Sequence, residues 1–171
     1  MKKLLTICLL IATAFTTNAQ NGKPTKEQTL SFLTKTFKLS EGETRTRITT
    51  RTDSKFIKTL CDFSIDKIIE NYDFESVLDG TEKSQGNKGY TYSNLKWESV
   101  TSIKLSSQEG NLTMVKIEFS SKIFVRDTDT YKDYINEITL DIVTSKAESF
   151  KKALERLVEI AKEENKNPFE D

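Results

Sequence analysis

The apolar residues follow a helical period at both ends of the chain and a period of two between them. Thr25 and Gln28 form a T-x-x-Q capping box, which is typical of a helix N-terminus. The apolar residues that follow at helical spacing are Leu30, Leu33 and Phe37, with Phe32 beside them. The pattern therefore predicts a short amphipathic helix over residues 26–37.

From residue 44 to residue 144 the pattern is that of strands, in which alternate side chains point to opposite faces of a sheet. Apolar residues in the first strands share one face: Ile57, Cys61, Phe63 and Ile65. Lys58 and Asp62 are predicted to face the other way. Tyr90, Tyr92 and Trp97 follow later in the chain, and we expect Trp97 to pack in the core.

The clearest alternation runs from Leu112 to Val125 and again from Tyr134 to Thr144. The predicted inward residues are Val115, Ile117, Phe119, Ile123 and Val125, then Ile138, Leu140 and Ile142. The predicted outward residues of the last strand are Glu137, Thr139 and Asp141. Each strand is therefore expected to bury one face and expose the other.

Polar segments separate the strands and contain most of the turn-forming residues. Asp79–Gly89 is predicted to be a long polar loop, Glu109–Asn111 a hairpin turn and Arg126–Asp133 a polar turn. The connections are short and no long helix lies between the strands. This organisation favours an antiparallel meander of six to seven strands.

The last part of the chain has the pattern of a second, longer helix. Ser145 and Glu148 form another capping-box pattern. The apolar stripe that follows consists of Phe150, Ala153, Leu154, Leu157, Val158 and Ala161. We therefore predict an α+β fold: a short N-terminal helix, an antiparallel bent sheet or partial barrel, and a C-terminal amphipathic helix covering one end. Phe169, after Pro168, is expected to fold back onto the domain.

This layout resembles the pleckstrin-homology-like (PH-like) fold, a bent antiparallel barrel with a helix at one open end. It is also similar to a group of small secreted bacterial proteins of uncharacterised function. The segments that carry the second likeness are "PTKEQTLSFL", "WESV" at Trp97–Val100, Lys152-Ala153-Leu154, Leu157 and Pro168-Phe169. The resemblance implies a binding module and assigns no functional residue, because PH-like folds have many unrelated roles.

The N-terminus has the pattern of a secretory signal peptide. Two lysines precede the apolar segment Leu4–Phe15, and small residues stand at Thr17 and Ala19. We expect cleavage near Ala19, so that residues 1–19 are the signal and residues 20–171 form a single domain. The mature protein is then expected to be secreted or periplasmic, without a membrane span.

Composition excludes several kinds of chemistry. The chain has no histidine, which removes the commonest general base and the commonest zinc ligand. Without Lys2 and Lys3 of the leader, 24 basic residues face 26 acidic ones, so nothing favours nucleic acid as a partner. Cys61 is the single cysteine after the leader and is expected to be a buried structural thiol.

Two clusters of charged residues are candidate sites. Arg45, Arg47 and Arg51 are predicted to share one side of a strand, where they could bind an anionic ligand or protect a sheet edge from aggregation. Asp127, Asp129 and Asp133 offer oxygen ligands for calcium within a short span. That span lacks the EF-hand pattern, and a solvated turn is the other interpretation.

Two hypotheses for the function remain open. The first is a non-catalytic binding or interaction module of the cell envelope, without a cofactor and monomeric. Its partner would be an envelope protein, a glycan or a lipid. The second is a hydrolase that works with Asp and Glu carboxylates alone, with or without calcium. Self-association through an exposed strand edge is a third, structural possibility.

Overall fold

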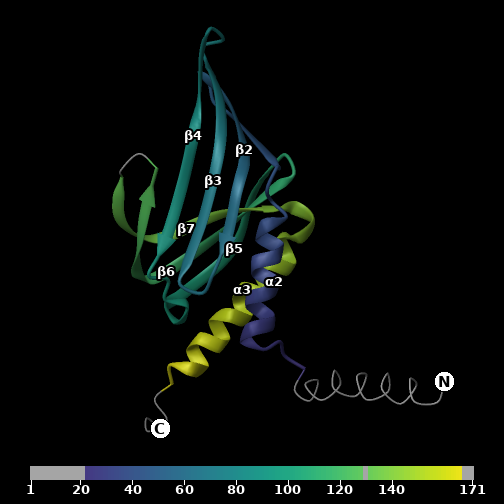
Figure 1. The fold of residues 1–171 in the computed structure, drawn as a ribbon, viewed down its shortest axis with the longest axis vertical. Helices are drawn as coiled ribbons and strands as arrows, with labels where there is room; N and C mark the ends of the chain where they lie inside the picture. The colour runs from purple at the N-terminus through teal and green to yellow at the C-terminus, as the bar shows by residue number, and fades with distance from the viewer. Residues whose placement is uncertain (1–21, 129–130, 167–171) are drawn as a thin grey trace, which may run out of the picture.

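The computed structural model describes residues 22–128 and 131–166 of the chain. The fold is α+β, as the sequence predicts, with two helices and a bent, open antiparallel sheet of seven strands (Figure 1). The elements are α2 (Lys26–Lys38), β1 (Thr44–Ile48), β2 (Thr52–Phe63), β3 (Lys67–Leu78), β4 (Glu82–Ser93), η1 (Trp97–Ser99), β5 (Val100–Glu109), β6 (Leu112–Asp127), β7 (Lys132–Val143) and α3 (Thr144–Glu164). The predicted leader and the Pro168–Phe169 segment lie outside the described residues.

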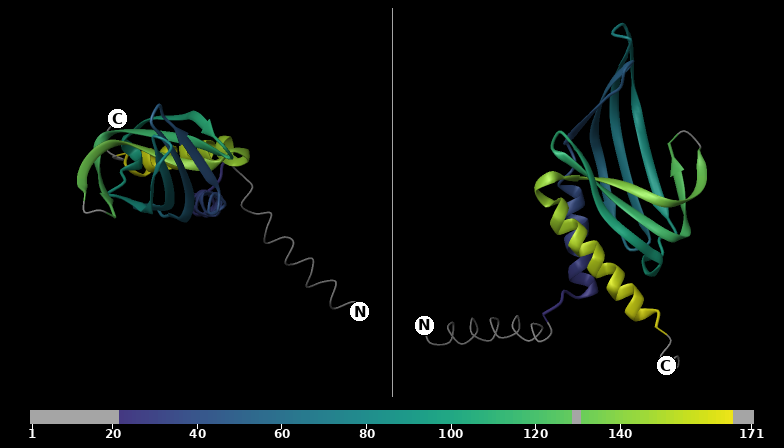
Figure 2. Two further views of the ribbon diagram at one scale, coloured as in Figure 1. Left: turned by 90° about the horizontal axis from the view of Figure 1, so that it is seen from above. Right: turned by 180° about the vertical axis from the view of Figure 1, so that it is seen from behind.

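The strands follow the order β1-β2-β3-β4-β6-β5, and β7 pairs with the remaining edge of β6. β4 meets β6 along a short ladder, in which Tyr90–Ser93 pair with Phe124–Asp127. The far ends of β2, β3 and β4 extend beyond both helices (Figures 1 and 2). We call this part of the sheet, residues 52–57, 73–78 and 82–88, the blade.

The core lies where α2 and α3 cover the other end of the sheet. The two helices lie side by side and α3 packs on β5, β6 and β7 (Figure 2). Trp97 is buried and its indole N–H donates to the carbonyl of Ile65 at 2.5 Å. The fully buried large apolar residues are Leu33, Phe37, Ile68, Leu112, Ile117, Ile123, Ile138, Leu140, Ile142, Phe150 and Leu154. This set includes most of the residues that the alternation predicts to face inward.

The two helices begin differently. Thr25 caps α2 through its hydroxyl, which accepts from the amide of Gln28, and the Gln28 side chain accepts from the amide of Thr25. The predicted capping box is therefore confirmed. The one predicted for α3 is wrong: its N-cap is Val143, which makes no side-chain cap bond. β7 continues directly into the helix at Thr144, so Ser145 already lies inside the first turn.

The segment predicted as a long loop, Asp79–Gly89, is mostly strand. β4 begins at Glu82, and only a tight turn separates it from β3. Asp79 and Gly80 adopt positive φ angles of 47° and 74° in this turn. The prediction failed because neither of the two described helices covers a face of the blade, and a strand exposed on both faces shows no apolar alternation (Figure 1).

Lys58 and Asp141 were both predicted to face outward, and both are buried. The register of β2 against β3 shifts between Lys58 and Leu60, which places Lys58 on the same face as Cys61. Asp141 alternates correctly with its neighbours, but its side of β7 is covered by β1, β2 and β3. Among the described residues, no helix is long and apolar enough to cross a membrane.

Candidate functional site

Lys58 occupies the centre of a buried charged network inside the bend of the sheet. Its ammonium group lies 3.0 Å from Oε2 of Glu70 and donates to the backbone carbonyl of Asp141 at 2.6 Å. The same group lies 4.3 Å from the centre of the Phe37 ring. A lysine has three N–H donors, so a carboxylate, a carbonyl and an aromatic face together satisfy it.

Two tyrosines and a second carboxylate extend this network. The hydroxyl of Tyr72 lies 2.9 Å from Oε2 of Glu70 and 2.9 Å from Oδ2 of Asp141, while Tyr92 donates to Oε1 of Glu70 at 3.4 Å. Burial, followed by the negative charge of Glu70, raises the pKa of both Tyr72 and Tyr92 well above 10. Both phenols therefore stay protonated and act as donors.

The network reaches the surface through Arg45, whose side chain is 23% exposed. Arg45 lies 3.2 Å from Oδ2 of Asp141 and stacks on the ring of Phe56. Its partners come from β1, β2, β3 and β7, although β7 has no ladder with the first three strands. The ion pairs and hydrogen bonds of this network hold β7 against the inner face of β1–β3, so its side chains have a structural role.

The three arginines predicted to bind an anion are not brought together. Arg45 and Arg47 lie on the same face of β1, but Arg51 lies in the turn before β2. Arg51 donates to both carboxylate oxygens of Asp79, at 3.2 and 2.7 Å. Arg47 is exposed. With Arg45 held by Asp141 and Arg51 by Asp79, the structure gives no convergent anion site from this set.

The predicted calcium ligands belong to the turn between β6 and β7, and Asp129 lies outside the described residues. Asp127 accepts from the amide of Tyr131 at 3.0 Å. Asp133 accepts from the Tyr131 hydroxyl and the Tyr134 amide, which together hold its pKa below the usual value. Within residues 22–128 and 131–166, no three acidic or thiol side chains are grouped as metal ligands. The calcium-assisted hydrolase stays a prediction.

Cys61 behaves as the sequence predicts. Its side chain is 4% exposed and faces the core beside Phe63. Burial is the main reason that the pKa of its thiol rises from 9.0 to about 12. A thiol that is protonated and covered is a poor nucleophile, so Cys61 has the properties of a packing residue.

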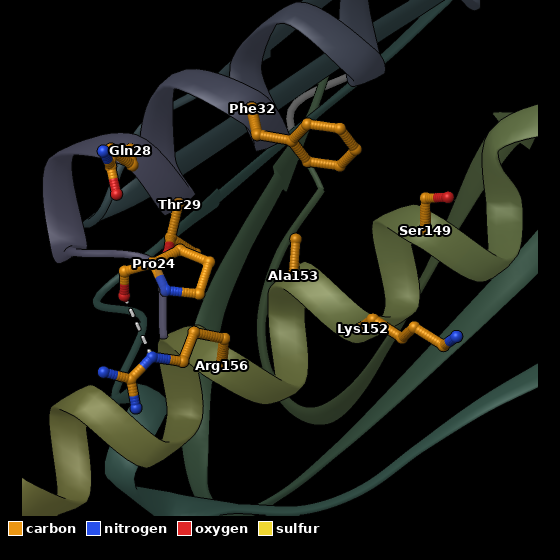
Figure 3. A pocket seen from close by; sticks show the side chains of 8 residues that line it. All are labelled: Pro24, Gln28, Thr29, Phe32, Ser149, Lys152, Ala153 and Arg156. Atoms are coloured by element: carbon orange, nitrogen blue, oxygen red, sulfur yellow. Dashed lines mark hydrogen bonds between the residues drawn. The ribbon is translucent and has the colours of Figure 1, made fainter. Parts of the chain in front are cut away.

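An open groove of about 500 Å³ lies between α2 and α3 (Figure 3). Pocket volumes of about 300–1,000 Å³ are usual for small ligands. The lining residues are Pro24, Gln28, Thr29, Phe32, Ser149, Lys152, Ala153 and Arg156. We call this space the helix groove.

Phe32 forms one wall of the helix groove and is 40% exposed. Its ring extends from α2 toward Ala153 and Ser149 of α3 (Figure 3). A ring exposed to this extent leaves apolar surface in contact with water, which a ligand could cover. The wall arises because Phe32 lies one position before Leu33, which points into the core.

Two cationic side chains of α3 line the helix groove: Arg156 lies beside Pro24, and Lys152 lies nearer Ser149 (Figure 3). Nε of Arg156 donates to the carbonyl of Pro24 at 3.0 Å (Figure 3). The guanidinium of Arg156 also pairs with Glu159 at 3.0 Å. The bonds from Arg156 and Lys23 lower the pKa of Glu159. Lys152 is exposed, and none of the eight lining residues is acidic. The groove therefore combines an apolar wall with two cationic side chains.

Sequence reasoning did not single out the helix groove. It noted Phe32 beside the apolar stripe and assigned Ala153 to the stripe of the last helix, but Lys152 and Arg156 received no role. The available signal was an aromatic residue one position outside an amphipathic face. That signal does not show which helix lies opposite Phe32. The groove can therefore be recognised only once the packing of α2 on α3 is known.

Comparisons with known proteins identify no relative: no protein family, no curated protein and no solved structure matches this chain. The resemblance to PH-like secreted proteins therefore stays a prediction.

Proposed function

We propose that this protein is a non-catalytic binding module of the cell envelope that holds an amphipathic ligand in the helix groove. The ligand has an apolar chain and an anionic end, as a fatty acid does. The observation that carries the proposal is the ring of Phe32, 40% exposed on the wall of a groove without acidic lining.

The apolar part of the ligand is expected to lie between Phe32 and Ala153. Covering half of a phenylalanine side chain contributes about 1–1.5 kcal/mol, or about tenfold in affinity. Pro24 adds apolar surface at the other end. Oε1 of Gln28 accepts from the amide of Thr25 and the Thr29 hydroxyl donates to the carbonyl of Thr25, so these two atoms do not need the ligand.

The anionic part is expected to lie near Lys152 and Arg156. Lysine and arginine are the usual partners of carboxylates and phosphates. The carbonyl of Pro24 and the carboxylates of Glu159 and Glu163 already hold Arg156 in place, so its planar guanidinium is a fixed group. Since both cations stand close to solvent, each contributes about 0.2–1 kcal/mol.

The envelope assignment rests on the leader, in which two lysines precede the apolar segment Leu4–Phe15 and the small residues Thr17 and Ala19. A carrier or sensor of amphipathic molecules would suit that location, where lipids and their products are abundant.

The test is calorimetric titration with decanoate below its micelle concentration, with decyltrimethylammonium as the cationic counterpart. We expect decanoate to bind one site and the cation to bind at least about fivefold more weakly. Phe32→Ser should weaken decanoate about tenfold. Leu39→Ser removes an apolar side chain that is more exposed than Phe32 but lies outside the groove, and it should have no effect. Equal affinity for both probes, or equal losses in both variants, would refute the proposal.

A second pair of variants tests whether decanoate binding depends on positive charge at the groove. Lys152→Glu places an acid at the groove and should weaken decanoate about fivefold. Lys146→Glu makes the same change on an exposed position of α3 that does not line the groove, and should leave the affinity unchanged.

A further inference from the structure

The outer edge of β4 is open along most of the blade. β4 pairs with β3 over all twelve of its residues but with β6 only from Tyr90 to Ser93. The open edge ends at Gly89, because the amide of Thr128 donates to the Gly89 carbonyl at 3.0 Å. Within the described part of the chain, no strand pairs with the outer edge of residues 82–88 (Figure 1). Such an edge is a template for an added strand.

We propose that this edge pairs with the same edge of a second copy of the chain, antiparallel and centred on Gln85. The sequence of the edge is Glu82-Lys83-Ser84-Gln85-Gly86-Asn87-Lys88. A two-fold axis at Gln85 sets Glu82 of each copy opposite Lys88 of the other, so two pairs of opposite charges form. The same register sets Lys83 opposite Asn87 and Gln85 opposite itself.

The small residues of the edge also match in this register. Ser84 of one copy lies opposite Gly86 of the other, on the face that carries Phe74. The ring of Phe74 covers Gly86 so closely that a Cβ there would lie 3.0 Å from Cε1. A small residue opposite Gly86 therefore fits, and it can pack against the edge of this ring.

The β1 edge of the sheet disfavours the same kind of self-pairing. Antiparallel self-pairing of β1 around Thr46 would set Arg45 opposite Arg47, and like charges opposite each other are destabilising. The turn between β5 and β6 also covers the start of β1, where Asn111 donates to Glu43 at 3.1 Å. These two edges thus differ in charge pattern and in cover, and of the two the β4 edge is the self-complementary one.

Pairing of seven residues buries a small interface, well below the roughly 1,200 Å² of stable complexes. The dimer should therefore be weak and depend on protein concentration. It would join two blades into one continuous sheet and leave both helix grooves, at the far ends, accessible. The inference is independent of the proposed ligand.

The first experiment is sedimentation velocity of the purified protein over a range of concentrations. The parent chain should show a reversible monomer–dimer equilibrium. Glu82→Lys sets lysine opposite lysine twice, Lys88→Glu sets acid opposite acid twice, and each should weaken the dimer at least about fivefold. An equimolar mixture of the two variants restores every opposite-charge pair in the heterodimer, and should associate as well as the parent chain.

The second experiment fixes the register by disulfide trapping. Gln85→Cys should form a cross-linked dimer under mild oxidation, because the two introduced thiols face each other at the axis. Thr46→Cys, exposed on β1, is the matched control and should form no disulfide-linked dimer, and the buried Cys61 should not react in either. Three results would each overturn the proposal. The parent chain could stay monomeric at every concentration, or the mixture of charge variants could associate no more strongly than each variant alone. Equal cross-linking of Gln85→Cys and Thr46→Cys would be the third.

Discussion

The ammonium group of Lys58 lies 3.0 Å from the carboxylate of Glu70, and both side chains are buried in the bend of the sheet. An ion pair in this position contributes little net stability, because removing two charges from water offsets most of their attraction. Breaking it is costly, since the remaining charge stays buried without its partner. The pair therefore determines which substitutions the sheet tolerates.

Replacing Lys58 with methionine keeps most of the volume but removes the charge that faces Glu70. We expect the free energy of unfolding to fall by about 3–5 kcal/mol, measured by urea denaturation. Lys55→Met is the matched control, because Lys55 is exposed on the same strand and should change stability by less than about 0.5 kcal/mol. Similar values for the two variants would contradict the network as described.

The hydroxyl of Tyr72 bridges Glu70 and Asp141, and Tyr72→Phe removes it without changing the ring. The two carboxylates would then lose their common donor, so we expect a loss of about 1–3 kcal/mol. Tyr134→Phe makes the same chemical change on an exposed tyrosine and should be nearly neutral. The two variants are compared by thermal and urea unfolding, and an equally small effect in both would show that the bridge contributes nothing.

Stability should fall at alkaline pH. The pKa of Cys61 is raised from 9.0 to about 12, and those of Tyr72 and Tyr92 are raised above 10. The folded state therefore keeps protons that the unfolded chain has released, so this stabilisation is complete below about pH 9 and is lost as pH rises. Each group adds about 1.4 kcal/mol per pH unit to the slope.

Part of the slope of the unfolding free energy against pH can be assigned to one residue, Tyr92. Tyr92→Phe should flatten the decline above pH 10 relative to the parent chain. Unfolding free energies at pH 8, 10 and 11 are sufficient to measure it. A stability that stays constant between pH 9 and pH 11 would contradict the burial of these groups.

The two helix starts give a paired prediction. Thr25→Ala removes a hydroxyl that caps α2 and should cost about 1 kcal/mol. Ser145→Ala changes a residue inside the first turn of α3, where no side-chain cap exists, and should change stability by less than about 0.5 kcal/mol. A large loss at Ser145 would instead support the capping box that the sequence suggests.

The sequence predicted the parts of the fold that depend on local patterns. Residues 26–37, the alternating strand around Ile117 and the stripe of α3 were identified because one face of each element is buried along its whole length. Lys58 was misplaced because a register shift in the middle of β2 changes which side chains face inward. Such a shift depends on pairing with β3 and leaves no mark in the spacing of apolar residues.

The remaining errors have tertiary causes. Asp141 alternates as an outward residue, and only the contact of β7 with β1–β3 buries it. The blade resembles a loop in sequence because both of its faces meet water. The helix groove depends on which turns of α2 and α3 lie together, so Phe32 and Lys152 could not be paired from their spacing.

The most direct test of the proposed function is nuclear magnetic resonance of the isotope-labelled protein during titration with decanoate. We expect saturable shifts of the backbone amide signals of Phe32, Ser149 and Ala153, on both walls of the helix groove. Signals of the distant blade, such as those of Ser84 and Gln85, should not move. Absence of saturable shifts at the groove, or shifts confined to other surfaces, would contradict it.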